Sequence, residues 1–150
     1  MFMKLSNKSR YGLRALVDLA VNSKDGHVAL NLIAERNGIS PQYLEQVFAS
    51  LRKAGIVKSI KGPQGGYFLA READQITAAD ILEALEGTYY LEEENISEIP
   101  AQTGISVAIQ ELLINRINHE MDILLNDINL ADLENYYMEH KLISDDMYYI

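Results

Sequence analysis

The chain has 150 residues, of which 48% are hydrophobic, and its 13 basic and 22 acidic residues give a formal net charge of −9 at pH 7. This length and composition predict a soluble, folded protein with one core of ordinary size. The chain contains no cysteine, which excludes disulfides, thiolate catalysis, thiolate zinc sites and thiolate-held iron–sulfur clusters.

Targeting and metal-binding signals are also missing from the sequence. No apolar run approaches the roughly 18 residues that a membrane span requires. The stretch MFMKLSNKSR at the N-terminus lacks the apolar segment of a secretory signal. We therefore expect a cytoplasmic protein without a membrane partner. The three histidines, His27, His119 and His140, form no metal-ligand spacing, so we expect no bound metal.

The charges divide between two parts of the chain. Residues 1–71 carry eleven Lys or Arg and four Asp or Glu, a balance of +7. Residues 72–150 carry two Lys or Arg and eighteen Asp or Glu, a balance of −16. Such a division is typical of a protein whose first part contacts phosphate and whose second part faces other protein or solvent.

The first predicted helix covers residues 7–23, with Asn7 or Ser9 as its N-cap. Its inward stripe consists of apolar residues at helical spacing: Leu13, Leu16, Val17 and Ala20. Basic and aromatic side chains gather at its start: Lys8, Arg10, Tyr11 and Arg14. They form either a solvated charged face or a phosphate contact, for which the start of a helix is well placed.

A helix-turn-helix is predicted next. A short second helix covers residues 32–36, with Asn31 as a late substitute for a proper cap, and Gly38 closes it. Only residues 38–40 separate it from a third helix, in which Ser40 is a good N-cap and Pro41 suits the first position. Two short helices joined by a glycine-containing turn of about three to four residues make this motif.

The third helix ends at Gly55 and has two distinct faces. Its inward face is apolar: Leu44, Val47, Phe48 and Leu51. Its outer face and boundary are mostly polar: Gln42, Tyr43, Glu45, Gln46, Ala49, Ser50, Arg52 and Lys53. Such a set can bond to base edges near the start of the helix and neutralise phosphates near its end. An ordinary amphipathic surface helix is the alternative.

A β-hairpin follows directly. Residues 56–60 and 67–69 read as strands, and the glycine-rich residues 62–66 form the turn between them. Lys58 and Lys61 lie on or near the tip. A nucleotide phosphate loop fits poorly, because the spacing of GxxxxGK[ST] is absent and a strand, not a helix, comes next.

The acidic half begins with a fourth helix, which starts in a capping box of Thr77 and Asp80 and ends at Gly87. Residues 88–104 read as a loop that contains a block of acids: Glu92, Glu93, Glu94 and Glu98. A solvated loop is the simplest interpretation, since the spaced ligand pattern of a dedicated Ca²⁺ loop is absent.

The longest helical pattern runs from Ile105 to about Ile128, and a short last helix near Leu130 to Tyr137 precedes the tail SDDMYYI. The apolar face of the long helix is wider than one core requires, so we expect it to pack on the same helix of a second subunit. A cofactor pocket is the alternative. The expected dimer contacts are Ile109, Leu112, Leu113, Ile117, Met121 and Leu124.

Five stretches match one family in combination. They are MKLSNKSRYGLRAL, IAERNGIS, SPQYLEQVFASLRKAG, IVKSIKGPQGGYFLA and ITAADILEALEG. Together they resemble the Rrf2 family of winged-helix bacterial transcription regulators, closely over residues 3–87 and in outline beyond. The resemblance implies a mainly α fold with a small β-wing: a winged helix-turn-helix domain at residues 1–87, the acidic loop at 88–104, a dimerisation helix and C-terminal helix at 105–143, and a tail at 144–150.

The resemblance also implies DNA contacts, with the third helix in the major groove and the wing in the adjacent minor groove. By motif position, Lys61 would stand at the wing tip, and the start of the first helix would meet phosphate. The predicted DNA-binding residues are Lys8, Ser9, Arg10, Tyr11, Ser40, Gln42, Tyr43, Glu45, Gln46, Arg52, Lys53, Lys58 and Lys61.

The family resemblance bears on cofactor and partner as well. Many members hold an iron–sulfur cluster on three cysteines in the loop after the fourth helix; residues 88–104 contain none, so we expect no cluster and no other cofactor. The ending MYYI resembles that of the branch that represses cysteine metabolism in Gram-positive bacteria together with cysteine synthase. This implies docking of the tail into the synthase, with folding back or disorder as the alternative. The tail residues are Met147, Tyr148, Tyr149 and Ile150.

The predicted function is that of a homodimeric, sequence-specific DNA-binding repressor of cysteine and sulfur metabolism that acts with cysteine synthase. Two alternatives remain: a protein–protein adaptor that has lost DNA binding, and a regulator of the same family that senses a different small molecule. An enzyme is disfavoured, because the sequence contains no nucleophile–base pair, metal constellation or phosphate loop.

Overall fold

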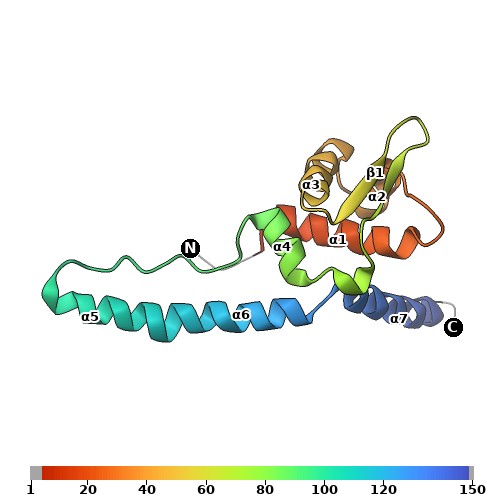
Figure 1. The fold of residues 1–150 in the computed structure, drawn as a ribbon. Helices are drawn as coiled ribbons and strands as arrows, with labels where there is room; N and C mark the ends of the chain where they lie inside the picture. The colour runs from red at the N-terminus through yellow and green to blue at the C-terminus, as the bar shows by residue number, and fades with distance from the viewer. Residues whose placement is uncertain (1–4, 149–150) are drawn as a thin grey trace.

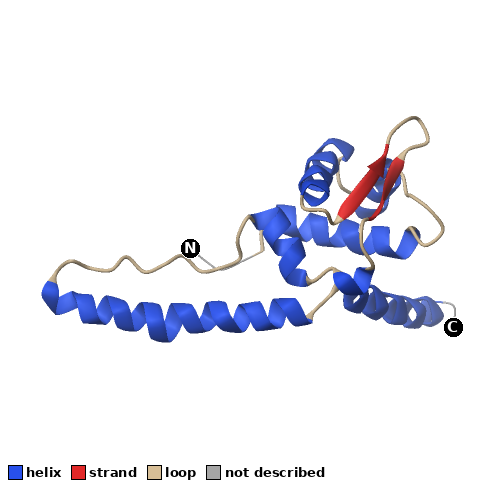
Figure 2. Ribbon diagram, viewed as in Figure 1, coloured by secondary structure: helices blue, strands red, loops and turns tan. Residues whose placement is uncertain are grey.

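A helical head with a small two-stranded sheet and a long helical rod make up the molecule (Figure 1). The computed structural model describes residues 5–148, with side chains described through residue 141. Helices dominate and the two strands lie at one side of the head (Figure 2). In chain order the elements are α1 (Asn7–Asn22), α2 (Leu30–Asn37), α3 (Pro41–Lys53), β1 (Val57–Ile60), β2 (Gly66–Leu69), η1 (Ala73–Gln75), α4 (Ala78–Glu86), α5 (Pro100–Ala108), η2 (Ile109–Ile114), α6 (Asn115–Asp127) and α7 (Leu130–Tyr148).

The core of the head is built around α1, because α2, α3, α4 and α7 all pack against this helix. Burial of large apolar side chains from each of these elements is the main favourable contribution to the stability of such a head. The fully buried side chains include Leu16, Leu19, Ile33, Leu44, Phe48, Leu51, Ile56, Ile81 and Leu130. The predicted fold class, mainly α with a small β-wing, is confirmed.

The start of α1 differs from the prediction. Ser6 is the N-cap, and its Oγ accepts a hydrogen bond from the Ser9 backbone N–H at 3.1 Å. Asn7 is the first helical residue, and Ser9 lies inside the first turn. The expected caps Asn7 and Ser9 were therefore wrong by one and three residues.

The helix-turn-helix is formed by α2 and α3. Helix α2 begins at Leu30, earlier than predicted, and Ala29 stands at its N-cap without a side-chain cap bond, so Asn31 is helical and caps nothing. Gly38 ends it in the left-handed region at φ 63°, a conformation that glycine adopts at no steric cost. Ser40 caps α3 as predicted, with its Oγ accepting from the Tyr43 N–H at 3.1 Å.

The wing is the predicted hairpin. Strands β1 and β2 are antiparallel, with Val57 opposite Leu69 and Ile60 opposite Gly66. A single bridge between Val28 and Tyr67 joins the hairpin to the segment before α2. Gly66 permits this approach, because a Cβ there would lie 2.4 Å from the carbonyl oxygen of Val28.

The rod consists of α5, η2 and α6 in direct succession, and residues 88–99 run back along it (Figure 1). It begins at Pro100, not at Ile105, so the loop is shorter than predicted. Six residues of the rod, Ile109–Ile114, form a π-helix, a local widening that the sequence did not indicate. No helix in the described part of the chain is long and apolar enough to cross a membrane.

The chain returns to the head after the rod. The Ala78 N–H donates to the Ile128 carbonyl at 2.7 Å, and the Leu130 N–H donates to the Ile76 carbonyl at 2.8 Å. Helix α7 then packs on α1 and continues to Tyr148, so residues 144–148 are helical and not a separate tail. Tyr149 and Ile150 lie outside the described residues, as do the side chains of Met147 and Tyr148.

Candidate nucleic-acid interface

Helix α3 presents a polar face to solvent. Its four inward side chains, Leu44, Val47, Phe48 and Leu51, are 0% exposed. The outward residues are exposed, as predicted: Gln42, Glu45, Gln46, Ala49, Arg52 and Lys53. Amides and a carboxylate near the start of the helix can pair with base edges, and two cations in its last turn can meet phosphates.

A groove of about 450 Å³ separates α3 from the wing. One wall carries Gln42 and Glu45 at the start of α3, and the other carries Ile60, Lys61 and the glycine-rich turn. Lys58 and Lys61 are both exposed. The structure therefore brings the predicted helix and wing residues to one side of the head, in the arrangement that a helix in one DNA groove and a wing in the next would require.

The start of α1 adjoins the flank of α3. The Lys8 ammonium donates to the Ser50 hydroxyl at 2.9 Å. Tyr11 packs edge-on against Tyr43, with ring centroids 5.8 Å apart, and the Arg14 guanidinium lies 5.5 Å from the centre of the Tyr11 ring. These contacts fix α1 beside α3.

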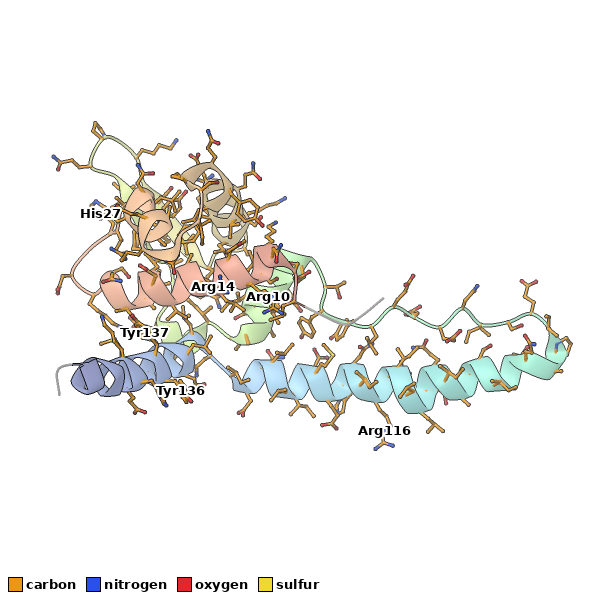
Figure 3. All side chains as sticks on the ribbon, turned by 180° about the vertical axis from the view of Figure 1, so that it is seen from behind. Arg10, Arg14, His27, Arg116, Tyr136 and Tyr137 are labelled. Carbon is orange, nitrogen blue, oxygen red and sulfur yellow. The ribbon has the colours of Figure 1, made fainter. Side chains whose placement is uncertain are left out.

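Arg10 and Arg14 extend the basic surface beyond α3 (Figure 3). Arg10 is exposed, and its Nε donates to the Leu5 carbonyl at 3.3 Å. Lys8 and Tyr11 are half-buried. The predicted DNA-binding residues include six Lys or Arg and a single acid, Glu45. This side of the head therefore carries a net positive charge.

Ser9 does not belong to this surface, and the prediction that it contacts DNA was wrong. Its side chain is 0% exposed, and its hydroxyl donates to the Glu86 carboxylate. The hydroxyl and backbone N–H of Ser6 donate to the same carboxylate oxygen. Hydrogen bonds from Ser6 and Ser9 hold the pKa of Glu86 below its ordinary value. The three residues thus join the start of α1 to the end of α4, a link that sequence reasoning missed.

A second polar contact network attaches residues 88–99 to the rod. The hydroxyls of Tyr89 and Tyr90 donate to the Asp122 carboxylate at 2.5 and 2.6 Å. These bonds raise the pKa of both tyrosines and lower the pKa of Asp122. Among the described residues, no three His, Asp or Glu side chains come together in a way that could hold a metal ion.

Backbone groups of the same loop bond to side chains farther along the rod. The Leu91 N–H donates to Asn118 at 2.8 Å, and the Glu94 N–H donates to Gln110 at 2.6 Å. The Ser97 N–H donates to the Ser106 hydroxyl at 3.2 Å. Side chains of the rod therefore satisfy loop N–H groups that would otherwise depend on water.

The other side of the rod is an exposed apolar surface. Leu112, Leu113 and Leu124 are 69%, 55% and 57% exposed. With Ile117, Met121 and Arg116 they line a groove of about 470 Å³. Arg116 projects away from the loop in Figure 3, so the groove lies on the side that the loop leaves open. Five of the six predicted dimer contacts lie here; the sixth, Ile109, lies in the π-helix outside the groove.

Comparison with known proteins places the chain among transcriptional regulators. The family model Rrf2, described as an iron-dependent transcriptional regulator, matches residues 5–136. The HTH-type transcriptional regulator CymR of Bacillus subtilis (strain 168) is 42% identical over 134 residues, which cover 89% of this chain and 91% of the relative. The structure described as CymR (YrzC), the global cysteine regulator of B. subtilis, superposes with a TM-score of 0.74 at 41% identity, over 90% of this chain and 98% of the other. T. potens IscR superposes with a TM-score of 0.67 at 36% identity, over 91% and 90%.

Proposed function

Because the chain belongs to the Rrf2 family of transcriptional regulators, we propose that it is a homodimeric repressor of cysteine and sulfur metabolism genes. As a regulator of this family it is a DNA-binding protein and not an enzyme. The observation that carries the proposal is the polar, exposed face of α3 beside a wing that bears two exposed lysines. The description of the B. subtilis relative as a global cysteine regulator supports the choice of target genes.

DNA recognition follows from the two kinds of side chain on this surface. Gln42, Glu45 and Gln46 read base edges, and Arg10, Lys61 and the cations at the end of α3 neutralise phosphates. A two-fold dimer presents two such surfaces, so the operator is an inverted repeat with half-sites about one helical turn, roughly 34 Å, or a little more apart.

The DNA proposal is tested by selecting genomic fragments with the purified protein and then measuring affinity against salt. Lys61→Ala should lower affinity for every sequence and reduce the slope of log affinity against log salt by about 0.9. Gln46→Ala should leave the slope unchanged and weaken discrimination at one or two base pairs by about 1–3 kcal/mol.

Arg71→Ala is the matched control for the loss of a cation. Arg71 lies after the wing, and its side chain is 40% exposed in an ion pair with Asp80, which contributes little to stability at an exposed site. An unchanged salt slope in Lys61→Ala, or an equal change in Arg71→Ala, would remove the wing from the interface.

The homodimer rests on the apolar groove of the rod. A contiguous exposed apolar surface such as that of Leu112, Leu113 and Leu124 is typical of an interface with another protein. Packing against the same groove of a second copy would remove this surface from water. Leu113→Glu should convert the dimer to a monomer in sedimentation velocity. Ile99→Glu is the control, because Ile99 is 58% exposed at the start of α5, outside the groove. A Leu113→Glu protein that sediments as a dimer would contradict this interface.

The partner proposal concerns the last residues. We propose that residues 147–150 dock into cysteine synthase, because a C-terminal carboxylate can be held by backbone N–H groups while the apolar side chain of Ile150 fills a pocket. Deleting these four residues should abolish capture of cysteine synthase in a pull-down and leave DNA binding by the free dimer intact. Undiminished capture by the truncated protein would refute it.

A further inference from the structure

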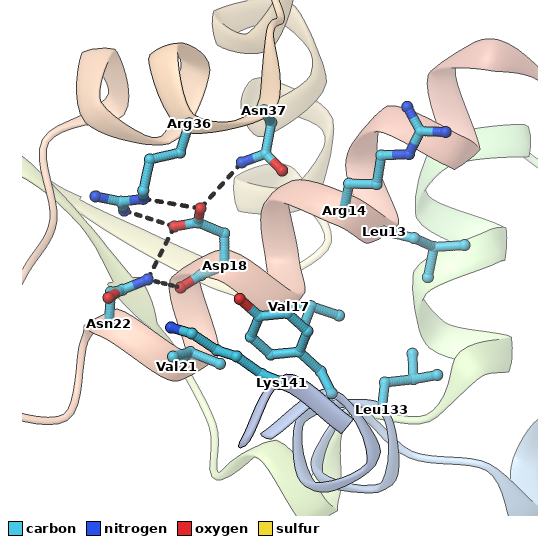
Figure 4. A pocket seen from close by; sticks show the side chains of 11 residues that line it. Leu13, Arg14, Val17, Asp18, Val21, Asn22, Arg36, Asn37, Leu133 and Lys141 are labelled. Atoms are coloured by element: carbon cyan, nitrogen blue, oxygen red, sulfur yellow. Dashed lines mark hydrogen bonds and ion pairs between the residues drawn. The ribbon is translucent and has the colours of Figure 1, made fainter. Parts of the chain in front are cut away.

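A pocket of about 680 Å³ lies between α1, α2 and α7 (Figure 4). This volume falls within the range of roughly 300–1,000 Å³ that small-molecule sites occupy. The pocket and the groove between α3 and the wing share no lining residue, although α2 borders both, with Leu30 and Asn31 at the groove and Arg36 and Asn37 at the pocket.

The body of the pocket is apolar. Leu13, Val17 and Val21 lie four residues apart on α1, so they form one stripe along the helix. All three are half-buried; Leu13 and Val17 pack against the edge of the core and also line the pocket. Leu133 and Tyr137 of α7 provide the opposite wall. An apolar ligand body would therefore be covered from two helices.

A polar network closes the end of the pocket next to α2. The Asp18 carboxylate accepts from Arg36 Nε at 2.9 Å, from Arg36 Nη2 at 2.6 Å and from the Asn37 amide at 3.0 Å. Asn22 donates to it as well, at 3.2 Å. The hydrogen bond that Arg36 donates to Asp18 raises the pKa of Arg36. With four donors on one carboxylate, Asp18 has its negative charge satisfied from within the protein.

The remaining charges at the pocket are positive. Its lining contains three cations, Arg14, Arg36 and Lys141, and one carboxylate, Asp18. Lys141 is one of only two basic residues after residue 71, where eighteen acids lie. Its ammonium is placed 5.8 Å from the centre of the Tyr137 ring, at the border of the apolar wall. A net positive rim around an apolar body is complementary to one class of small molecule.

We propose that this pocket binds a small amphipathic organic anion, a carboxylate with an apolar body. The body packs between the α1 stripe and α7, and the carboxylate meets Lys141 and Arg14, because the Arg36 guanidinium is already paired with Asp18. The site contacts α2 through Arg36 and Asn37, one turn before α3 begins. Its test uses no DNA, so its outcome is independent of the function proposed above.

The test uses three matched probes on the full chain, measured by titration calorimetry. Octanoate carries both features, octanamide keeps the apolar body without the charge, and acetate keeps the charge without the body. Octanoate should bind saturably with one site per chain, and each of the other two should bind at least about tenfold more weakly. No saturable octanoate binding, or octanamide binding as tightly as octanoate, would overturn the proposal.

Two substitutions locate the site. Lys141→Glu should weaken octanoate binding at least about tenfold, whereas Lys141→Arg, which keeps the charge, should stay within about threefold of the unmodified chain. Val21→Trp should abolish binding by filling the pocket, with Val21→Leu as its milder control; thermal unfolding verifies that each variant is folded. Octanoate binding that survives Val21→Trp in a folded protein would place the ligand elsewhere and refute the assignment.

Discussion

Gly12 offers the sharpest test of how the head is packed. It lies inside α1, where α1 meets α3 and α4. A Cβ at this position would lie 2.5 Å from Cδ1 of Leu85 and 3.3 Å from Cγ1 of Val47. Both neighbours belong to the buried core, with Val47 0% and Leu85 5% exposed. The added methyl group of Gly12→Ala would therefore clash with side chains of α3 and α4.

Two opposing effects set the magnitude. Alanine in a helix interior is favoured over glycine by about 1 kcal/mol. Forcing an extra methyl into a packed core costs about 1–3 kcal/mol. A separation of 2.5 Å is shorter than side chains tolerate, so Leu85, which is only 5% exposed, must shift within the core to admit the methyl group. We expect overpacking to win, so that the free energy of unfolding falls by about 1 kcal/mol.

Urea unfolding of Gly12→Ala is compared with that of Gly104→Ala. Gly104 lies inside α5, and a Cβ there would meet no heavy atom within 4 Å. The same substitution should therefore stabilise the chain at Gly104, by about 0.5–1 kcal/mol. If Gly12→Ala stabilised the chain as much as Gly104→Ala does, the close packing of α1 on α3 and α4 would be refuted.

Four further predictions concern local contacts. Ser40→Ala removes the cap of α3 and should lower the free energy of unfolding by about 1 kcal/mol in urea, with Ser40→Asp restoring most of it. Phe48→Ala empties a fully buried site beside Tyr67 and should cost about 3–5 kcal/mol in the same assay; a cost below about 1 kcal/mol would contradict the burial. Asp122→Ala should move the ionisation of Tyr89 down toward pH 10.0, followed by tyrosinate absorbance, because the carboxylate that favours the protonated hydroxyl is gone. In the unmodified chain the lowered pKa of Asp122 contributes stability above pH 3.8 that is lost on further acidification, and the raised tyrosine pKa contributes stability below pH 10.0 that is lost above it. The free energy of unfolding in urea should therefore depend on pH less strongly in Asp122→Ala than in the unmodified chain, and an identical dependence in the two would contradict this.

Local sequence signals were sufficient to predict α3 and the wing. Ser40 and Pro41 mark the start of α3, and its apolar spacing assigns the inward face without knowledge of the rest of the chain. The glycines of residues 62–66 likewise locate the wing turn. Each of these features depends on residues within about one turn of one another, so the sequence alone contains the necessary information.

The predictions failed where the structure depends on contacts between residues that are distant in the sequence. Asn7 and Ser9 were the expected caps of α1, but the cap is Ser6, which also bonds to Glu86, 80 residues farther along the chain. The same carboxylate accepts a hydrogen bond from Ser9, whose side chain is buried and does not reach the exposed surface beside α3. The start of the rod did have a local signal, since Pro100 stands at the first helical position. No local sequence signal indicated the pocket between α1 and α7, because it forms only where α7, which follows the rod, packs against α1.

The attachment of residues 88–99 to the rod sets a minimum length for that loop. Leu91 is fixed to Asn118 and Ser97 to Ser106. The two anchors on the rod lie twelve positions apart, at most roughly 18 Å at about 1.5 Å per residue, because Ile109–Ile114 form a π-helix that is wider and rises less per residue. The six loop residues that must cover this span reach at most about 20–22 Å when fully extended. Deleting one residue between Leu91 and Ser97 would shorten the fully extended reach by about 3.3–3.6 Å, so the positions of the two anchors limit how short this part of the loop can be.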